Sequence, residues 1–442
     1  MSKTTRRSLL KYSAATSALA ALGPLAGSRA FAQAAASPIR IGVLYDLSGP
    51  FTGAGSVPGS IGTQIAIDLT NEKGGVLGKH LVQPVAGDSQ SKADVALNEA
   101  ERLINEEKVD TIVGIYSSAH AIPLSQKMEA AKKILWITIA VATNVLKDKN
   151  LTYTFRAGVT ADHYGAAAIN LLKEYSQSKL GIAPKDLKVS IVHEDGPYGS
   201  DTSASDQDHA TAAGMQILMN EAYSATSSDL SGLVTKLQRA NADVVLHTGY
   251  NPDITLLLRQ ARDAGLKFKM LVGHGAGYSQ RDKLKETFGA DLDYFVNCDP
   301  VAAQNLKPGT LKSDLQDLVN IMVNRYQKVS GNTSVPPHVS MGFNQTWILL
   351  QKVLPVAITK YGGTHPAAIQ KAALDLDIPE GGTIQGYGVK FARPGTQYSG
   401  QNMRVEACVT QAYGDTEAIV WPDKLKTADV VMPLPKSNPY AA

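Results

Sequence analysis

The chain has 442 residues, of which 44% are hydrophobic and 19% are charged, and its formal net charge is +3. Five of its 43 basic residues, and none of its 40 acidic ones, fall within residues 1–32, so the rest of the chain holds 38 basic against 40 acidic residues. Such a balance lacks the basic patch that binds nucleic acid or an anionic membrane. About 410 residues are enough for two domains of ordinary size.

The first 32 residues have the composition of a bacterial export signal. Arg6 and Arg7 stand before a run rich in Ala, Ser and Leu, and Ala30-Phe31-Ala32 fits a cleavage site with small residues. Paired arginines are typical of Tat-type signals. A membrane anchor is the alternative, but the apolar run is shorter than the about 20 residues that span a bilayer. We therefore predict a Tat-type signal peptide at 1–32 and a periplasmic location.

From Ile39 onwards, short apolar runs alternate with amphipathic helical patterns. The runs are rich in β-branched residues, which is typical of strands buried on both faces of a parallel sheet. The predicted strands are 39–44, 81–85, 111–115, 135–140, 189–193, 244–247 and 270–272. Apolar stripes predict helices within 93–104, 230–237 and 254–261, and two longer helices at 311–328 and 339–360 precede apolar runs at 404–410 and 417–421.

The alternation restarts in the middle of the chain. A strand and loop at 39–55 have a counterpart at 189–199, each followed by a helix and another strand. This repetition predicts an α/β protein with two doubly wound, Rossmann-like lobes. In such sheets, ligands bind in the crevice beyond the carboxyl ends of the strands, where helix N-termini offer free N–H groups.

Two serines follow the predicted strand 111–115. Ser117 and Ser118 precede a helical segment that starts near Ala121, so their hydroxyls and the helix N-terminus suit a carboxylate or an amide. Simple N-capping by serine explains the same pattern. The next strand is followed by Ala140, Val141, Ala142 and Thr143, whose backbone groups and hydroxyl are expected to face the same crevice.

Two tyrosines occupy equivalent places after two later strands. Tyr198 follows 189–193 and Tyr250 follows 244–247, so both are candidates to stack on a ligand, although a single tyrosine is more often structural. Between the first of these strands and Tyr198, the run His193-Glu194-Asp195 offers ligating atoms. Adjacent residues point in different directions, however, and rarely ligate one ion, so no metal site is predicted.

The glycine-rich segment after the strand 270–272 supplies two further candidates. His274 is a polar side chain that could contact a ligand, and Gly275 lets a ligand approach the backbone closely. A glycine-rich turn with a solvated histidine is the alternative. The two cysteines, Cys298 and Cys408, either form a disulfide or remain buried thiols, and the sequence leaves both readings open.

Motifs of the common enzyme classes are absent from the sequence. The spacing Gly53-x-Gly55-x-x-x-Gly59 fits neither the dinucleotide nor the P-loop pattern, so no cofactor is predicted. The sequence also lacks a Gly-x-Ser-x-Gly elbow and a His-Glu-x-x-His helix. These absences favour a binding protein over an enzyme.

Five stretches, at 39–50, 71–79, 113–118, 192–199 and 258–266, resemble the type I periplasmic binding proteins of ABC transporters, in the branched-chain amino acid (Leu/Ile/Val) family. The resemblance covers the whole chain after the signal. It implies a hinge of three crossings, with one lobe at 38–158 plus 300–382 and the other at 159–299 plus 383–430. It also implies membrane permease subunits as partners and a small-molecule ligand held by closure of the lobes.

Carried over by position, the resemblance assigns the carboxylate and amine of a ligand to Ser118 and the segment from Ala140 to Thr143, with Tyr198 and Tyr250 closing from the second lobe. In amino-acid binders of this family, an acid after the late strand pairs with the ammonium group. Here that position corresponds to His274 or Gly275, and an aromatic position corresponds to His338. An α-amino acid would then need Glu194 or Asp195 as the substitute partner of its ammonium, so an amino acid, an amide such as urea and a carboxylate stay open as ligands. A ligand-sensing receptor module and a secreted hydrolase are the alternative functions, and the oligomeric state is not predicted.

Overall fold

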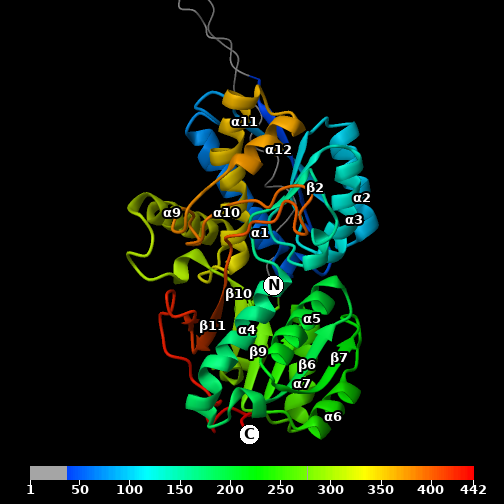
Figure 1. The fold of residues 1–442 in the computed structure, drawn as a ribbon, viewed down its shortest axis with the longest axis vertical. Coiled ribbons are helices and arrows are strands. Elements are labelled where there is room, and N and C mark those ends of the chain that lie inside the picture. The colour runs from blue at the N-terminus through cyan, green and yellow to red at the C-terminus, as the bar shows by residue number, and fades with distance from the viewer. Residues whose placement is uncertain (1–36, 276) are drawn as a thin grey trace, which may run out of the picture. The chain divides into compact units, whose positions relative to one another are not determined.

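Two sheets organise the computed structural model, which describes residues 37–275 and 277–442 (Figure 1). The predicted signal peptide at 1–32 lies outside the described residues. Within the described part of the chain, no helix combines the length and the apolar character needed to cross a membrane.

The first sheet has five parallel strands in the order β2-β1-β3-β4-β5. Helices α2 and α3 cover one face, and α1 with α10 to α12 cover the other, so the central strands are buried on both sides. The strands are β1 (Ile39–Tyr45), β2 (Val82–Asp88), β3 (Thr111–Gly114), β4 (Ile134–Ile137) and β5 (Thr154–Arg156).

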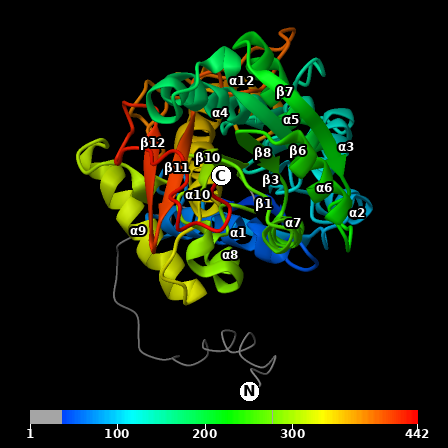
Figure 2. The same cartoon turned by 90° about the horizontal axis from the view of Figure 1, so that it is seen from below.

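The second sheet has seven strands in the order β12-β11-β10-β9-β8-β6-β7, seen from below in Figure 2. Its segment β7-β6-β8-β9-β10 repeats the order of the first sheet, which confirms the predicted pair of doubly wound lobes, and β11 and β12 add an antiparallel edge. The strands are β6 (Lys188–Glu194), β7 (Gln216–Tyr223), β8 (Val244–Thr248), β9 (Met270–His274), β10 (Val296–Pro300), β11 (Ala407–Tyr413) and β12 (Thr416–Trp421).

Helices α4 and α5 pack on one face of the second sheet, and α6 to α8 pack on the other. The helices of the described residues are α1 (Ser56–Glu72), α2 (Ala93–Asn105), α3 (Ser118–Ala130), α4 (Ala161–Tyr175), α5 (Pro197–Ala212), α6 (Ser231–Ala240), α7 (Asn251–Asp263), α8 (Arg281–Phe288), α9 (Ser313–Ser330), α10 (Pro337–Ile348), α11 (Leu354–Tyr361) and α12 (Pro366–Asp375). Each predicted strand and helix corresponds to one of these elements except the helix predicted at 339–360, which the structure divides into α10, a π-helical segment at Leu349–Val353 and α11.

Strands β5, β7 and β10 were not predicted. Strand β5 has three residues, and β10 carries Asn297 and Asp299 among its apolar residues, so neither forms an apolar run. Strand β7 is an edge strand in which exposed and half-buried positions alternate. These strands form because a neighbouring strand pairs with them, which local composition does not show.

The chain passes between the two lobes three times: after β5, after β10 and between α12 and β11. Before the last passage, the segment around 400 lies along β5, where Arg156 N donates to Gly400 O (2.9 Å) and Asn402 N donates to Arg156 O (2.9 Å). One apolar core contains residues of both sheets, such as Trp136 and Val272. The lobe boundaries stated above stay a prediction.

The two cysteines are free and buried in the structure. In the antiparallel pair of β10 and β11, Cys298 lies opposite Val409 and Cys408 lies opposite Asp299. Successive residues of a strand point to opposite faces, so the two thiols are on opposite sides of the sheet. Cys298 accordingly packs in the core with Val409, whereas Cys408 packs in another core with Ile419.

Candidate ligand-binding site

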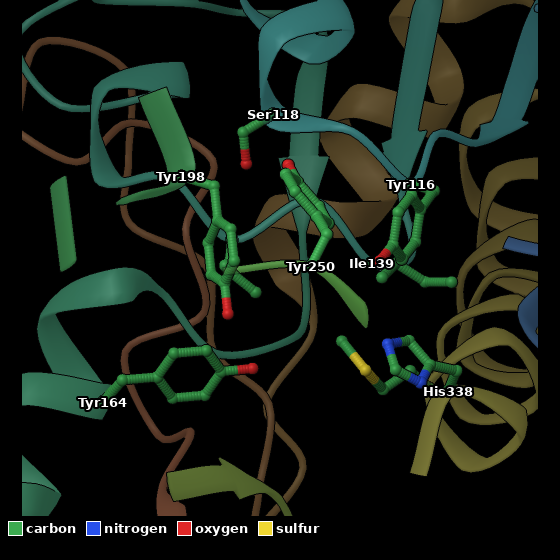
Figure 3. Close-up of a pocket in the computed structure, with 9 residues that line it drawn as sticks. Tyr116, Ser118, Ile139, Tyr164, Tyr198, Tyr250 and His338 are labelled. Carbon is green, nitrogen blue, oxygen red and sulfur yellow. The ribbon is translucent and has the colours of Figure 1, made fainter. Parts of the chain in front are cut away.

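A cavity lies where the two lobes meet (Figure 3). Its walls are strand-end loops and helix starts from both sheets, which is where doubly wound sheets bind ligands. The lining residues of the first lobe are Tyr116, Ser118, Ile139, Val141, His338 and Met341, and those of the second lobe are Tyr164, Tyr198 and Tyr250.

Ser118 is the first residue of α3 and is 2% exposed. Its Oγ accepts a hydrogen bond from the backbone N–H of Ala142 (3.0 Å), so the hydroxyl hydrogen remains available to a ligand. The first N–H groups of a helix have no partner further along it and carry its partial positive charge; in the first turn of α3, that of His120 donates to Ser117 O (3.2 Å). This arrangement can receive a carboxylate or a carbonyl oxygen.

Arg156 organises the loop that follows β4. Its Nη1 donates to the carbonyls of Ala140 (2.9 Å) and Ala142 (2.8 Å). Because a trans peptide directs its N–H opposite to its C=O, the N–H groups of Val141 and Thr143 point away from the guanidinium. Arg156 is 1% exposed, and burial lowers its pKa to about 9. A buried positive charge therefore lies behind this wall of the cavity.

Tyr198 and Tyr250 enter the cavity from the second lobe. Tyr198 is the second residue of α5, and its hydroxyl donates to the carbonyl of His274 (2.5 Å). Tyr250 precedes α7, and its ring lies 5.5 Å from that of Tyr198 and 4.8 Å from that of Phe51. Burial raises the pKa of both phenols, so they are neutral hydroxyl groups.

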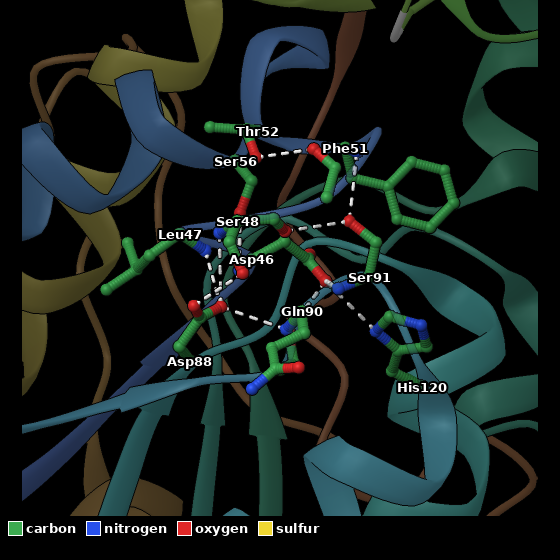
Figure 4. A network of polar contacts seen from close by, with 12 residues as sticks. Asp46, Leu47, Ser48, Phe51, Thr52, Ser56, Asp88, Gln90, Ser91 and His120 are labelled. Atoms are coloured by element: carbon green, nitrogen blue, oxygen red, sulfur yellow. Dashed lines mark hydrogen bonds and ion pairs between the residues drawn. The ribbon is translucent and has the colours of Figure 1, made fainter.

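Phe51 reaches Tyr250 because the loop after β1 is tied to the first sheet (Figure 4). The carboxylate of Asp88 accepts hydrogen bonds from the backbone N–H of Leu47 (2.9 Å) and from Ser48 Oγ (2.7 Å). Ser91 Oγ accepts a hydrogen bond from the N–H of Phe51 (3.0 Å). These contacts hold the aromatic side chain of Phe51, in the first lobe, against Tyr250 of the second lobe.

The structure thus brings four of the predicted site residues together in the cavity wall: Ser118, Val141, Tyr198 and Tyr250. Three further predicted residues lie behind the wall and support it. The carbonyl oxygens of Ala140 and Ala142 accept hydrogen bonds from Arg156, and Thr143 Oγ1 accepts one from the backbone N–H of Asp162 (3.3 Å). Ser117 is 1% exposed, and its Oγ has no hydrogen-bond partner in the described structure.

His274 and Gly275 do not line the cavity. The imidazole of His274 lies inside the second lobe, where Nδ1 is 3.0 Å from Thr248 Oγ1 and Nε2 is 3.2 Å from Asp206 Oδ1. Gly275 packs against the ring of Tyr164, and a Cβ at this position would lie 3.0 Å from the Tyr164 hydroxyl. His274 therefore contributes its carbonyl, as the acceptor for Tyr198, rather than its side chain.

Sequence reasoning missed four lining residues: Tyr116, Ile139, Tyr164 and Met341. Tyr116 and Ile139 each lie within two residues of a predicted site residue, so a wider window after the strands would have found them. Tyr164 and Met341 lie within helices and have no local signal. His338 was named only through the resemblance; its Nδ1 lies 3.5 Å from Gln280 Nε2 of the second lobe, and burial lowers its pKa to about 4.

The acidic residue at the end of β6, Glu194, stabilises the second lobe and does not line the cavity. Glu194 accepts hydrogen bonds from the backbone N–H groups of Gly196 (2.7 Å) and Gly199 (2.6 Å) at the start of α5. Burial raises the pKa of this carboxyl. Across residues 37–275 and 277–442, no three His, Cys, Asp or Glu side chains are grouped so that they could hold a metal ion.

The sequence is similar to those of known periplasmic binding proteins. Residues 38–398 match a family described as periplasmic binding protein. Leu/Ile/Val-binding protein homolog 7 of Brucella abortus is 30% identical over 417 residues, which cover 92% of this chain and 98% of the relative. Homolog 8 of Brucella suis is 32% identical over 383 residues, which cover 85% and 89%.

Solved structures of similar fold include two binding proteins for branched-chain amino acids or leucine. A leucine binding protein, LivK, from Thermotoga maritima has a TM-score of 0.70 at 20% identity and covers 88% of this chain and 100% of its own. The substrate binding protein LivJ of a branched-chain amino acid transporter from Streptococcus pneumoniae, in complex with isoleucine, has a TM-score of 0.69 at 18% identity and covers 87% and 100%.

Proposed function

Since the chain belongs to the periplasmic binding proteins of the Leu/Ile/Val-binding type, we propose that it is the solute-binding component of an ABC importer. It captures one small solute between its two lobes and delivers it to the membrane permease. Proteins of this family bind substrates for transporters and are not enzymes, as the sequence predicts for this chain. The protein is exported by its Tat-type signal at 1–32 and works in the periplasm.

The observation that carries this proposal is the shared cavity. Ser118 belongs to the first lobe and Tyr250 to the second, and both line the same space. A solute between them gains all its contacts only when the lobes meet, so binding and lobe closure are coupled. The permease can then distinguish the loaded from the empty protein by the arrangement of the lobes.

Within the cavity, Ser118, the N-terminus of α3 and the N–H of Val141 receive a carboxylate or carbonyl oxygen of the solute. The support comes from the available hydroxyl hydrogen of Ser118, the free N–H groups of the first helical turn, and the buried charge of Arg156 behind the loop. Tyr198 and Tyr250 cover the solute from the second lobe.

The test is a thermal-shift and equilibrium-dialysis screen of the purified protein against amino acids, urea, other amides, and aliphatic and aromatic carboxylates. We expect saturable binding of at least one solute, which is recovered chemically unchanged. Conversion of the solute to a product, or no saturable binding by any of them, contradicts the proposal.

Two variants locate the site. For the solute that binds best, Ser118→Ala and Tyr250→Ala are each expected to raise Kd by about tenfold or more, because each removes a contact made within the cavity. Ser125→Ala is the matched control, since Ser125 is also buried on α3 but donates to the carbonyl of Ile122 away from the cavity. Unchanged affinity in both test variants would show that the solute binds elsewhere.

A further inference from the structure

The cavity is walled by aromatic rings from both lobes. The ring of Tyr250 lies 6.3 Å from that of Tyr116 and 5.5 Å from that of Tyr198, and the ring of His338 lies 5.8 Å from that of Tyr116. The pairs are tilted by 49–52° at the separations of direct aromatic contact, so together they form one continuous aromatic wall. Aromatic rings arranged in this way favour a flat ring that packs against them face-on or edge-on.

None of the nine described lining residues carries a carboxylate. Four carboxylates near the tyrosines lie outside the lining and accept hydrogen bonds within their own lobe: Glu194 from two backbone N–H groups, Asp253 from the N–H of Tyr250 (3.0 Å), Asp46 from Ser89 Oγ (2.6 Å), and Asp299 from Asn297 Nδ2 (2.9 Å). An ammonium group in the cavity would therefore find no carboxylate in the cavity wall, and burying it without one is costly.

The two ends of the cavity differ in chemistry. Figure 3 shows Ser118 at one end and Tyr164 with His338 at the other. Tyr164 is 3% exposed and lines this end of the cavity. His338 is neutral because burial lowers its pKa, so its ring offers one donor and one acceptor nitrogen. This end suits a neutral polar group such as a hydroxyl.

The place of Tyr164 depends on Gly275. A side chain at position 275 would meet the Tyr164 ring, with the nearest ring carbon 3.1 Å from its Cβ. Glycine directly after β9 therefore leaves the space to the phenol.

Resting on the proposed function, we propose that the solute is a hydroxylated aromatic carboxylate. Its carboxylate binds at Ser118 and the α3 N-terminus, its ring packs against the wall of tyrosines, and its distal hydroxyl bonds to Tyr164 and His338. An α-amino acid of similar size is disfavoured because the cavity wall offers no carboxylate to its ammonium.

Isothermal titration calorimetry with four probes tests this: 4-hydroxybenzoate, benzoate, cyclohexanecarboxylate and L-leucine. We expect 4-hydroxybenzoate to bind most tightly, benzoate about tenfold more weakly, and cyclohexanecarboxylate more weakly still, with no saturable binding of L-leucine. Tighter binding of L-leucine, or equal binding of the aromatic and cyclohexane rings, overturns the ligand class and leaves the proposed function intact. Absence of saturable binding by 4-hydroxybenzoate at millimolar concentration also overturns it.

The variant Tyr164→Phe separates the distal hydroxyl bond from general damage, because the ring is kept. We expect Kd for 4-hydroxybenzoate to rise about tenfold and Kd for benzoate to stay within about twofold. Tyr413→Phe is the matched control, because its hydroxyl bonds to Gln411 Oε1 (2.7 Å) within β11. An equal loss for both probes in Tyr164→Phe, or no loss for either, contradicts the assigned role of Tyr164.

Discussion

Asp253 is a buried carboxyl that supports the cavity without lining it. Its Oδ1 accepts the N–H of Tyr250 (3.0 Å) at the start of α7, and its Oδ2 accepts the hydroxyl of Tyr223 (2.6 Å). The Tyr223 hydroxyl is also 2.8 Å from His247 Nε2. Burial raises the pKa of Asp253 to about 7, although these hydrogen bonds lower it. The charged form is therefore unfavourable in the folded protein.

The raised pKa makes folding stability depend on pH. Between the ordinary pKa of about 4 and the folded value of about 7, the folded state binds more protons at Asp253 than the unfolded state does, so its contribution to stability falls as pH rises through this range. Asp253→Asn removes this dependence and keeps an acceptor for Tyr250. Relative to the wild type, we expect the variant to gain stability between pH 5 and pH 8, at about 1.4 kcal/mol per pKa unit and a few kcal/mol at most.

Urea unfolding at pH 5 and pH 8 measures the difference in stability between Asp253→Asn and the wild type. The comparison with the wild type is needed because His163 and His338, whose pKa values burial lowers to about 4, act in the opposite direction and lose stability as pH falls below about 6.5. Parallel pH profiles of wild type and Asp253→Asn would show that Asp253 does not titrate in this range.

Among the elements, α1 and α10 set the first-lobe side of the cavity. They approach closely at glycines: a Cβ on Gly342 would lie 2.0 Å from the carbonyl oxygen of Gly59, and a Cβ on Gly62 would lie 2.2 Å from that of Val339. Close backbone approach needs residues without side chains. This contact fixes α10, which carries His338 and Met341 into the cavity.

We expect Gly342→Ala to destabilise the protein by about 1–3 kcal/mol, because the added methyl group pushes two helix backbones apart. Gly232→Ala is the matched control: Gly232 is exposed on α6, nothing lies within 4 Å of its added Cβ, and alanine favours the helix by up to about 1 kcal/mol. Thermal and urea unfolding measure both. Equal stability of Gly342→Ala and wild type would mean that the helices separate at no cost.

At the scale of the whole molecule, a polar contact away from the cavity also joins the lobes. Asp201 on α5 of the second lobe accepts hydrogen bonds from the backbone N–H of Asn144 (2.8 Å) and from its side-chain amide. Asn144 follows β4 of the first lobe, in the same loop that Arg156 holds from behind. Part of the free energy that keeps the lobes together thus comes from the protein rather than from the solute.

We expect Asp201→Ala to increase the radius of gyration of the ligand-free protein and to raise Kd for its solute several-fold, because fewer molecules have their lobes in contact before binding. Small-angle X-ray scattering and calorimetry measure the two effects. Asp208→Ala, on the exposed face of the same helix, is the control and is expected to change neither. If Asp201→Ala and Asp208→Ala have the same radius of gyration and the same Kd, the contact between Asp201 and Asn144 does not hold the lobes together.

Local pattern was enough to predict the two lobes, most strands and four residues of the cavity wall. The strands could be predicted because buried parallel strands are continuous apolar runs. The cavity residues could be predicted because doubly wound sheets bind ligands at the ends of their strands. Ser118, Tyr198 and Tyr250 follow strands directly, so their position along the chain indicates their position in space. The family resemblance is confirmed by the match over residues 38–398.

Long-range packing decided the rest. Tyr164 lies inside α4 and reaches the cavity only because Gly275, far away in the chain, leaves room for its ring. The side chain of His274 turns into the second lobe, where Thr248 and Asp206 receive it. Cys298 and Cys408 stay apart because pairing of β10 with β11 directs them to opposite faces. Each outcome depends on which segments meet in space, and neighbouring residues in the chain carry no information about that.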